Sequence, residues 1–218
     1  MPVTSEPERF FRERHATYAG FIRWVRYPQG LRAFFLSSPL LRPGLRILDA
    51  GCGTGALTLA VHDVLARRGF PARALDAFDL TPAMLDHLRA TIRRRAIDGI
   101  ALAEANVLAL DALPADWTSY DLVVSASMLE YVPRDRFVDA LRGLRGRLRD
   151  DGRFVLFMTR RNPLTRVLIG RWWASNLYTR DELRRAFGAA GFRDVAFPGF
   201  PPGGAHLAAW GHVVTARR

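Results

Sequence analysis

A glycine-rich turn, LDAGCGTG at residues 48–55, follows a short apolar run. Residues 46–50 are typical of a buried strand, and residues 55–69 have the spacing of a helix that ends at a glycine. Glycines at such a junction let the backbone turn sharply and approach a ligand, which the amide groups of the helix N-terminus then face. A strand, a bare turn and a helix in this order predict the first unit of a ligand-binding α/β sheet.

The alternation of strands and helices continues along the chain. Further strands are expected at 73–80, 100–107, 120–127 and 152–159, helices at 81–96, 133–150 and 179–192, and a closing strand pair at the C-terminal end. One or two amphipathic helices are expected within 6–37. This order is typical of a doubly wound α/β sheet with helices on both faces, which binds ligands at the carboxyl ends of its strands.

Composition narrows the class of protein. The 218 residues are 49% hydrophobic and 24% charged, as in ordinary globular domains, and no apolar run is long enough to predict a membrane-spanning helix. The charged N-terminal stretch lacks the apolar segment of a signal peptide, so we expect a cytoplasmic location. The single cysteine, Cys52, excludes an intramolecular disulfide framework and a multi-cysteine zinc site. We expect no metal, and we expect Cys52 to be a small filler of the turn.

The net charge is +11, and all 32 basic residues are arginine. Such a charge is compatible with nucleic acid or an anionic membrane surface. The complete absence of lysine, however, indicates a compositional bias of the genome. The arginines are also spread along the chain, where a nucleic-acid interface would concentrate them. A nucleic-acid partner is therefore not expected.

Two acids accompany the glycine turn. Asp79 ends the second expected strand, where an acid can bind both hydroxyls of a ribose. Its alternative role is to cap the following helix, for which Thr81 is the better candidate. The glycines alone also fit a dinucleotide fingerprint, but Asp49 just before them would oppose a pyrophosphate and favour a cationic amino acid.

In combination, these features resemble the class I S-adenosylmethionine-dependent methyltransferases over about 45–216. The segments that carry the resemblance are ILDAGCGTG, FDLTPAML, EANVLAL, YDLVVSASMLEYVP, LRDDGRFVLF and LYTRDELRRAFGAAGF. Asp150 and Asp151 depart from the family pattern, because they replace its usual Pro-Gly. The resemblance implies a Rossmann-like sheet of seven strands, mostly parallel with an antiparallel C-terminal strand. It also implies S-adenosyl-L-methionine as the cofactor and S-adenosyl-L-homocysteine as its product.

The resemblance further implies the cofactor-binding residues. Those of the turn would face the methionine part: Gly51, Cys52, Gly53 and Gly55. Asp49 would hold the turn or the amino group of the cofactor, and Ser125 would lie near the same amino-acid moiety. At the other end of the cofactor, Asp79 would bind the ribose. Leu80 and Val107 would flank the adenine, and Asn106 would form a hydrogen bond with its amino group.

Methyl transfer from a sulfonium mainly needs alignment and exclusion of water, and the acceptor decides whether a general base is required. Five side chains are candidates for that base or for the lining of the acceptor pocket: His15, Tyr18, Glu130, Tyr131 and His206. Each has the alternative of being a plain structural or surface group.

We expect an N-terminal helical segment, 1–43, and a cofactor-binding catalytic domain, 44–218, with an insertion at about 159–178. The N-terminal segment is expected either to close over the acceptor or to pack a flank of the sheet. The insertion mixes arginines with tryptophans, and it fits either a pocket wall or a peripheral contact with an anionic membrane.

The function expected from the sequence is methyl transfer to a small, fairly apolar acceptor such as a quinone, a lipid or a secondary metabolite. One alternative is an RNA methyltransferase, although the [ND]-P-P-[YF] sequence used on base amines is absent after the fourth expected strand. The other is a cofactor-binding protein without turnover. The sequence indicates neither the methylated atom nor the oligomeric state.

Overall fold

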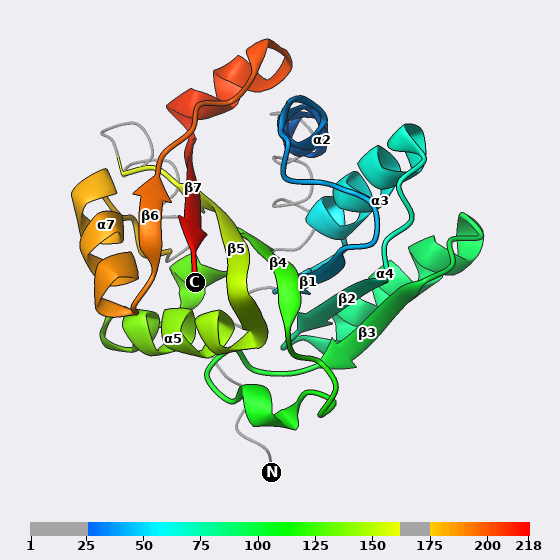
Figure 1. Ribbon diagram of the computed structural model, residues 1–218, viewed down its shortest axis with the longest axis horizontal. Coiled ribbons are helices and arrows are strands. Elements are labelled where there is room, and N and C mark those ends of the chain that lie inside the picture. The colour runs from blue at the N-terminus through cyan, green and yellow to red at the C-terminus, as the bar shows by residue number, and fades with distance from the viewer. Residues whose placement is uncertain (1–25, 162–174) are drawn as a thin grey trace.

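The computed structural model describes residues 26–161 and 175–218 of the chain. At its centre is a seven-stranded sheet of order β3-β2-β1-β4-β5-β7-β6 (Figure 1). The strands are β1 (Arg46–Ala50), β2 (Ala74–Asp79), β3 (Ile100–Glu104), β4 (Tyr120–Ala126), β5 (Leu148–Thr159), β6 (Arg193–Ala196) and β7 (Gly211–Arg217). Neighbouring strands are parallel except that β7 is antiparallel to both β5 and β6. This confirms the predicted doubly wound sheet.

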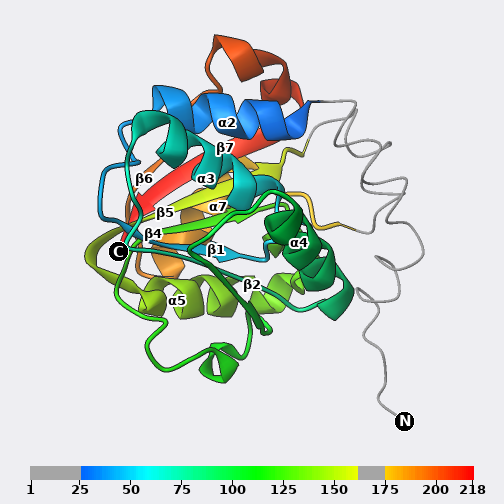
Figure 2. The same cartoon turned by 90° about the vertical axis from the view of Figure 1, so that its right-hand side faces the viewer.

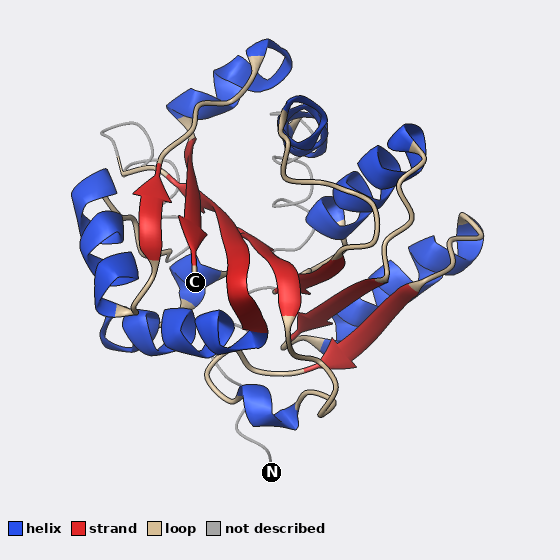
Figure 3. Cartoon of the chain, viewed as in Figure 1, coloured by secondary structure: helices blue, strands red, loops and turns tan. Residues whose placement is uncertain are grey.

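Helices cover both faces of the sheet (Figure 3). The helices are α2 (Tyr27–Ser37), α3 (Ala56–Arg68), α4 (Pro82–Arg94), α5 (Phe137–Arg147) and α7 (Arg180–Ala189). In the described ranges, 3-10 segments are η1 (Leu110–Ala112), η2 (Leu129–Tyr131), η3 (Arg134–Arg136) and η5 (Pro202–Ala209). On one face lie α2, α3 and α4, and on the other lie α5 and α7 (Figure 1).

Alternate residues of the central strands feed the cores on the two faces. In β5, Phe154 points toward α7, where its ring stacks on that of Phe187 at 5.7 Å between centroids. Phe157 points to the opposite face and meets the ring of Phe34 in α2 edge-on at 5.2 Å. A strand buried on both sides in this way must be apolar throughout, as the sequence of β5 is after its first residues.

The junction between α5 and β5 differs from the expectation. The predicted helix 133–150 ends at Arg147, because Leu148 already pairs with Tyr120 of β4. The register then slips, so that Leu122 pairs with Arg153. At Gly152 inside this bulge a Cβ atom would lie 2.8 Å from the carbonyl oxygen of Tyr120, which only glycine avoids.

Of the expected N-terminal helices, the structure describes α2. It follows Arg26, whose φ of 53° is left-handed, and it packs beside α3 and η5 (Figure 2). The buried Leu31 and Phe35 place α2 in the same core as β1 and α3. The described part therefore packs a flank of the sheet, while the lid role and the boundary after residue 43 stay predictions.

Three of the predictions concern residues outside the described ranges: His15, Tyr18 and most of the insertion at 159–178. Within the described ranges, no helix is both long and apolar enough to cross a membrane.

Candidate functional site

The glycine turn lies at the carboxyl end of β1, next to the switch point between β1 and β4. Gly51, Gly53 and Gly55 have φ values of 73°, 53° and 92°, which favour glycine. A Cβ atom at Gly51 would lie 2.2 Å from Met128, and one at Gly55 would lie 2.3 Å from Leu88. A Cβ atom at Gly53 would meet nothing within 4 Å. Close packing therefore requires two of the glycines, and Gly53 leaves backbone that a ligand can approach.

Asp79 fastens this turn from the end of β2. The backbone N–H of Gly53 donates to its Oδ2 at 2.8 Å, and that of Thr81 donates to its Oδ1 at 2.9 Å. Thr81 precedes α4 but makes no side-chain cap. Burial raises the pKa of Asp79. Because each carboxylate oxygen can accept a second hydrogen bond, Asp79 can hold the turn and still accept two hydroxyl groups, beside the half-buried Leu80.

Asp49 lies beneath the turn and is fully buried. Thr58 donates its hydroxyl to Oδ2 at 2.6 Å, which ties β1 to the first turns of α3. Oδ1 is buried without a hydrogen-bond donor among the described residues. Burial, reinforced by the negative charge of Asp79, raises the pKa of Asp49 to about 7. A buried acceptor that lacks a donor suits a water molecule or the ammonium group of a ligand.

Three further predicted cofactor residues lie at the same edge. Ser125 is buried and donates its hydroxyl to the carbonyl of Ala50 at 2.8 Å, which holds β4 against β1. Asn106 is exposed and its Oδ1 accepts the N–H of Leu108 at 2.9 Å, so that it stabilises its own turn. Val107 is buried after β3. The Asn106 amide nitrogen is not used in that turn and keeps its donor capacity.

Cys52 has its side chain in the core. It packs with three residues of β2 and α4: Ala77, Leu85 and Leu88. Burial, together with the charges of Asp49 and Asp79, raises the pKa of the thiol. This environment agrees with a small neutral filler, and any contact of Cys52 with a cofactor falls to its backbone.

Glu130 lies in η2, just after β4, with 2% of its surface exposed. Its Oε2 accepts the backbone N–H of Thr159 at 2.9 Å, and its carbonyl accepts the N–H of Asn176 at 2.8 Å. Burial raises the pKa of its carboxyl group to about 7. Tyr131 follows it, half-buried. Through its bond to Thr159, Glu130 thus joins the turn after β4 to the end of β5.

Tyr27 is a further candidate for the site, which the sequence did not indicate. Its hydroxyl from the start of α2 lies 3.3 Å from that of Ser127, which has a left-handed φ of 55°. Burial raises the pKa of Tyr27, and the charges of Glu130 and Asp49 raise it further, so the phenol stays protonated. Pro28, near the start of the helix, was the available signal that Tyr27 begins α2.

His206 is exposed in η5. Because β7 runs antiparallel, its first residue Gly211 pairs with Thr159, the last residue of β5. The η5 segment therefore lies at the carboxyl edge of the parallel strands, beside α2 (Figure 2). The structure thus brings Glu130, Tyr131 and His206 to one edge of the sheet.

The electrostatics of this edge contrast with the charge of the whole chain. Asp49, Asp79 and Glu130 all have raised pKa values, and none makes an ion pair with a residue in the described ranges. A buried site that collects acids without cations suits a positively charged ligand and opposes a pyrophosphate. Among the residues that the structure describes, no group of three or more His, Cys, Asp or Glu side chains could hold a metal ion.

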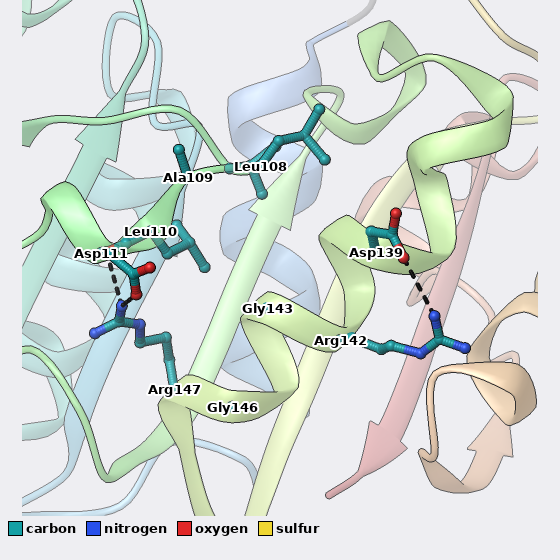
Figure 4. A pocket seen from close by; sticks show the side chains of 10 residues that line it. Leu108, Ala109, Leu110, Asp111, Asp139, Arg142, Gly143, Gly146 and Arg147 are labelled. Carbon is teal, nitrogen blue, oxygen red and sulfur yellow. Dashed lines mark hydrogen bonds and ion pairs between the residues drawn. The ribbon is translucent and has the colours of Figure 1, made fainter.

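A separate hollow of about 380 Å³ lies on the α5 side (Figure 4). It is lined by Val107, Leu108, Ala109, Leu110, Asp111, Asp139, Arg142, Gly143, Gly146 and Arg147. Its rim carries two ion pairs, Arg147 with Asp111 at 3.8 Å and Arg142 with Asp139 at 3.2 Å. Since only Val107 of the predicted site residues lines it, this hollow is not the candidate site.

A family model described as a methyltransferase domain matches residues 47–152. The malonyl-[acyl-carrier protein] O-methyltransferase of Geobacter sulfurreducens is 32% identical over 164 residues, which are 69% of this chain and 56% of the relative. The ubiquinone biosynthesis O-methyltransferase of Hahella chejuensis is 34% identical over 47% of this chain and 39% of its own. The chain thus spans about half the length, or less, of these two relatives.

Solved structures agree on the fold. An N-methyltransferase of Haemonchus contortus, in complex with phosphomonomethylethanolamine and S-adenosylhomocysteine, matches with a TM-score of 0.73. The match covers 99% of this chain and 60% of the other at 13% identity, so it speaks for the fold alone. By its matched domain, its relatives and its sheet, the chain belongs to the class I S-adenosylmethionine-dependent methyltransferases.

Proposed function

We propose that the chain transfers a methyl group from S-adenosylmethionine to an oxygen atom of a small, fairly apolar acceptor. The observation that carries the proposal is the electronegative carboxyl edge, where the half-buried Asp79 holds the open backbone of Gly53 and the buried Asp49 and Glu130 lie at the ends of the neighbouring strands β1 and β4. When bound, the cofactor supplies an activated methyl group on a cationic sulfonium. Its second positive charge, the ammonium group, also suits this edge.

The described residues fit the cofactor at both ends. We assign Asp79 to the ribose hydroxyls, because both of its oxygens keep accepting capacity after binding the turn. We assign Gly51 and Gly53 to the methionine end and Asp49 to its ammonium group, through a water or directly at Oδ1. Leu80, Val107 and Asn106 are left for the adenine.

On the acceptor side, we assign Glu130 as the general base. A carboxyl group with a pKa of about 7 is partly ionised near neutral pH and can take a proton from an acceptor hydroxyl. Tyr27 is too weakly acidic to share that role, so we assign its hydroxyl as a hydrogen-bond donor near the reacting oxygen. Ser127 orients the Tyr27 hydroxyl, and its left-handed backbone agrees with a functional constraint.

The choice of oxygen is supported by the relatives, because both of those described are O-methyltransferases. One acts on a malonyl group carried by a protein and the other in ubiquinone biosynthesis, so a carboxylic acid and a phenol are the acceptor classes to test. A cytoplasmic location and a peripheral membrane contact of the insertion also stay predictions.

The proposal is tested by transfer of radioactive methyl from S-adenosylmethionine to matched carboxylic acids and phenols. We expect product with at least one class, sensitive to base treatment if it is an ester and resistant if it is an aryl ether. With a phenol as acceptor, the Glu130→Gln variant should lower kcat about 100-fold, as for loss of a general base, while binding S-adenosylhomocysteine as the parent does. A carboxylic acid is already ionised near pH 7, so its methylation should be much less affected. Cofactor binding without transfer to any acceptor would favour the binding-only alternative and contradict the proposal.

A further inference from the structure

A group of cationic side chains gathers around Phe197, which lies between β6 and η5. The guanidinium carbon of Arg180 lies 5.6 Å from the centre of the Phe197 ring, and that of Arg184 lies 5.3 Å from it. The buried His212 meets the same ring edge-on, at 6.2 Å between centroids. Arg180 begins α7 and His212 is the second residue of β7, so the group lies at the carboxyl edge of the parallel strands.

Little negative charge balances this group. Arg180 makes no ion pair with any residue in the described ranges, and Arg184 pairs with the exposed Asp181 at 3.1 Å. A surface pair of that kind screens its cation only weakly. Arg160 follows β5, and the field of Arg180 and Arg160 adds to burial in lowering the pKa of His212 to about 4. The imidazole is therefore neutral near pH 7, and the positive charge of the group comes from its arginines.

We propose that Arg180 and Arg184 form a subsite for an anionic group such as a phosphate or a carboxylate. Guanidinium groups bind such oxyanions through charge-assisted hydrogen bonds, and their stacking on Phe197 holds them in place. The first turn of α7 adds the positive end of a helix dipole. The buried His212 beneath them is a neutral neighbour that a bound anion would affect.

Resting on the proposed function, the location assigns this anion to the far end of the acceptor. His212 lies on β7, two strand spacings from β4, and Phe197 follows β6, three spacings from β4, so the subsite lies about 10–15 Å along the sheet from the end of β4. The part of the carboxyl edge near Asp49 and Asp79 carries negative charge, and the part around Phe197 carries positive charge. An acceptor with an apolar body, a methyl-accepting oxygen at one end and an anion about 10–15 Å away would be oriented by that contrast.

The subsite is tested with sulfate, whose charge stays constant over the pH range used. The His212 imidazole is titrated by NMR at fixed ionic strength, with chloride replaced stepwise by sulfate. We expect a saturable rise in the pKa of His212. Arg180→Gln should weaken sulfate binding about tenfold, as for loss of one charge-assisted hydrogen bond, and should itself raise the pKa of His212. Asp181→Asn should tighten binding, because it removes the competing carboxylate.

Arg185→Gln is the matched control, since it removes an exposed arginine of the same helix, whereas Arg180 and Arg184 are the arginines that stack on Phe197. It should leave sulfate binding unchanged within about twofold. The proposal is overturned if sulfate causes no saturable change at His212, or if Arg185→Gln weakens binding as much as Arg180→Gln. S-Adenosylhomocysteine binding on the same samples reports separately on the proposed function, and circular dichroism checks the fold of each variant.

The acceptor assignment is tested with pairs of acceptors that differ only in a distal phosphate, such as an acyl pantetheine and its 4′-phosphate. The parent should use the phosphorylated member with a KM at least fivefold lower, as for one weakly screened charge pair, and Arg180→Gln should abolish that preference. The same phosphate presented on a carrier protein separates a free metabolite from a carried one. A preference that survives Arg180→Gln would contradict the assignment.

Discussion

Asp79 shows how one side chain joins structure to binding. Its two oxygens receive the N–H groups of Gly53 and Thr81, and the same oxygens are assigned to the ribose. The sequence predicted its position at the end of a strand, since that follows from hydrophobic alternation. The bond to Gly53 links residues that lie 26 positions apart, and only the folded chain reveals it.

Replacing Asp79 by alanine removes both its hydrogen bonds to the backbone of the turn and its assigned contact with the ribose. We expect Asp79→Ala to weaken the affinity for S-adenosylhomocysteine at least tenfold, because hydrogen bonds to a charged group are worth about 1.5–3 kcal/mol. Isothermal titration calorimetry measures the change. Asp86→Ala, which removes an exposed acid of α4, is the control and should bind normally. Equal affinity of the two variants would mean that Asp79 does not bind the ribose.

Glu130 makes the free energy of unfolding depend on pH. Its pKa in the folded chain is about 7, above the value of 4.5 for the free side chain. Between these two values the folded form holds a proton that the unfolded form has lost, so unfolding becomes easier as the pH rises. Below pH 4.5 both forms are protonated and the difference vanishes.

The Glu130→Gln variant keeps an oxygen for the N–H of Thr159 but cannot ionise. We therefore expect the variant to gain stability relative to the parent between pH 5 and pH 8, on the order of 1–3 kcal/mol. Urea denaturation at the two pH values measures this difference. Asp49 shifts in the same direction but is present in both proteins and cancels. A stability difference that does not change with pH would contradict a raised pKa at Glu130.

At the scale of elements, the bulge between β4 and β5 depends on one glycine. Residues 148–153 pass opposite only Tyr120–Leu122, and the backbone at Gly152 lies against the carbonyls of Tyr120 and Arg149. The sequence predicted both the helix and the strand here, but it misplaced their boundary by three or four residues. Strand pairing sets that boundary, and pairing partners are distant in the chain.

We expect Gly152→Ala to destabilise the fold by about 1–3 kcal/mol, because the new Cβ atom would overlap backbone that cannot move aside cheaply. Gly146→Ala in the exposed last turn of α5 is the opposite case, since its Cβ atom would meet nothing within 4 Å. That variant should gain about 0.5–1 kcal/mol from helix propensity. The urea midpoints of the two variants, compared with that of the parent, measure these changes. A Gly152→Ala protein as stable as the parent would mean that the bulge can relax.

For the whole molecule, fold class was predictable because hydrophobic periodicity and turn residues repeat at every strand and helix. The acids and glycines of the cofactor edge were predictable for the same reason, since each lies near or just after the end of a strand. Tyr27 and the cations around Phe197 were not, because they meet partners far away in the chain. A net charge of +11 also conceals that the acids gather at one part of the carboxyl edge and arginines at another.

The central claim is that one cationic nucleoside binds at the acidic part of the carboxyl edge. Titration of the full chain with S-adenosylhomocysteine, by calorimetry and by thermal unfolding, tests this directly. We predict saturable one-to-one binding, with a rise in Tm of about 5–10 °C at a ligand concentration 100 times Kd. An absence of both heat and thermal shift at millimolar ligand would contradict the account.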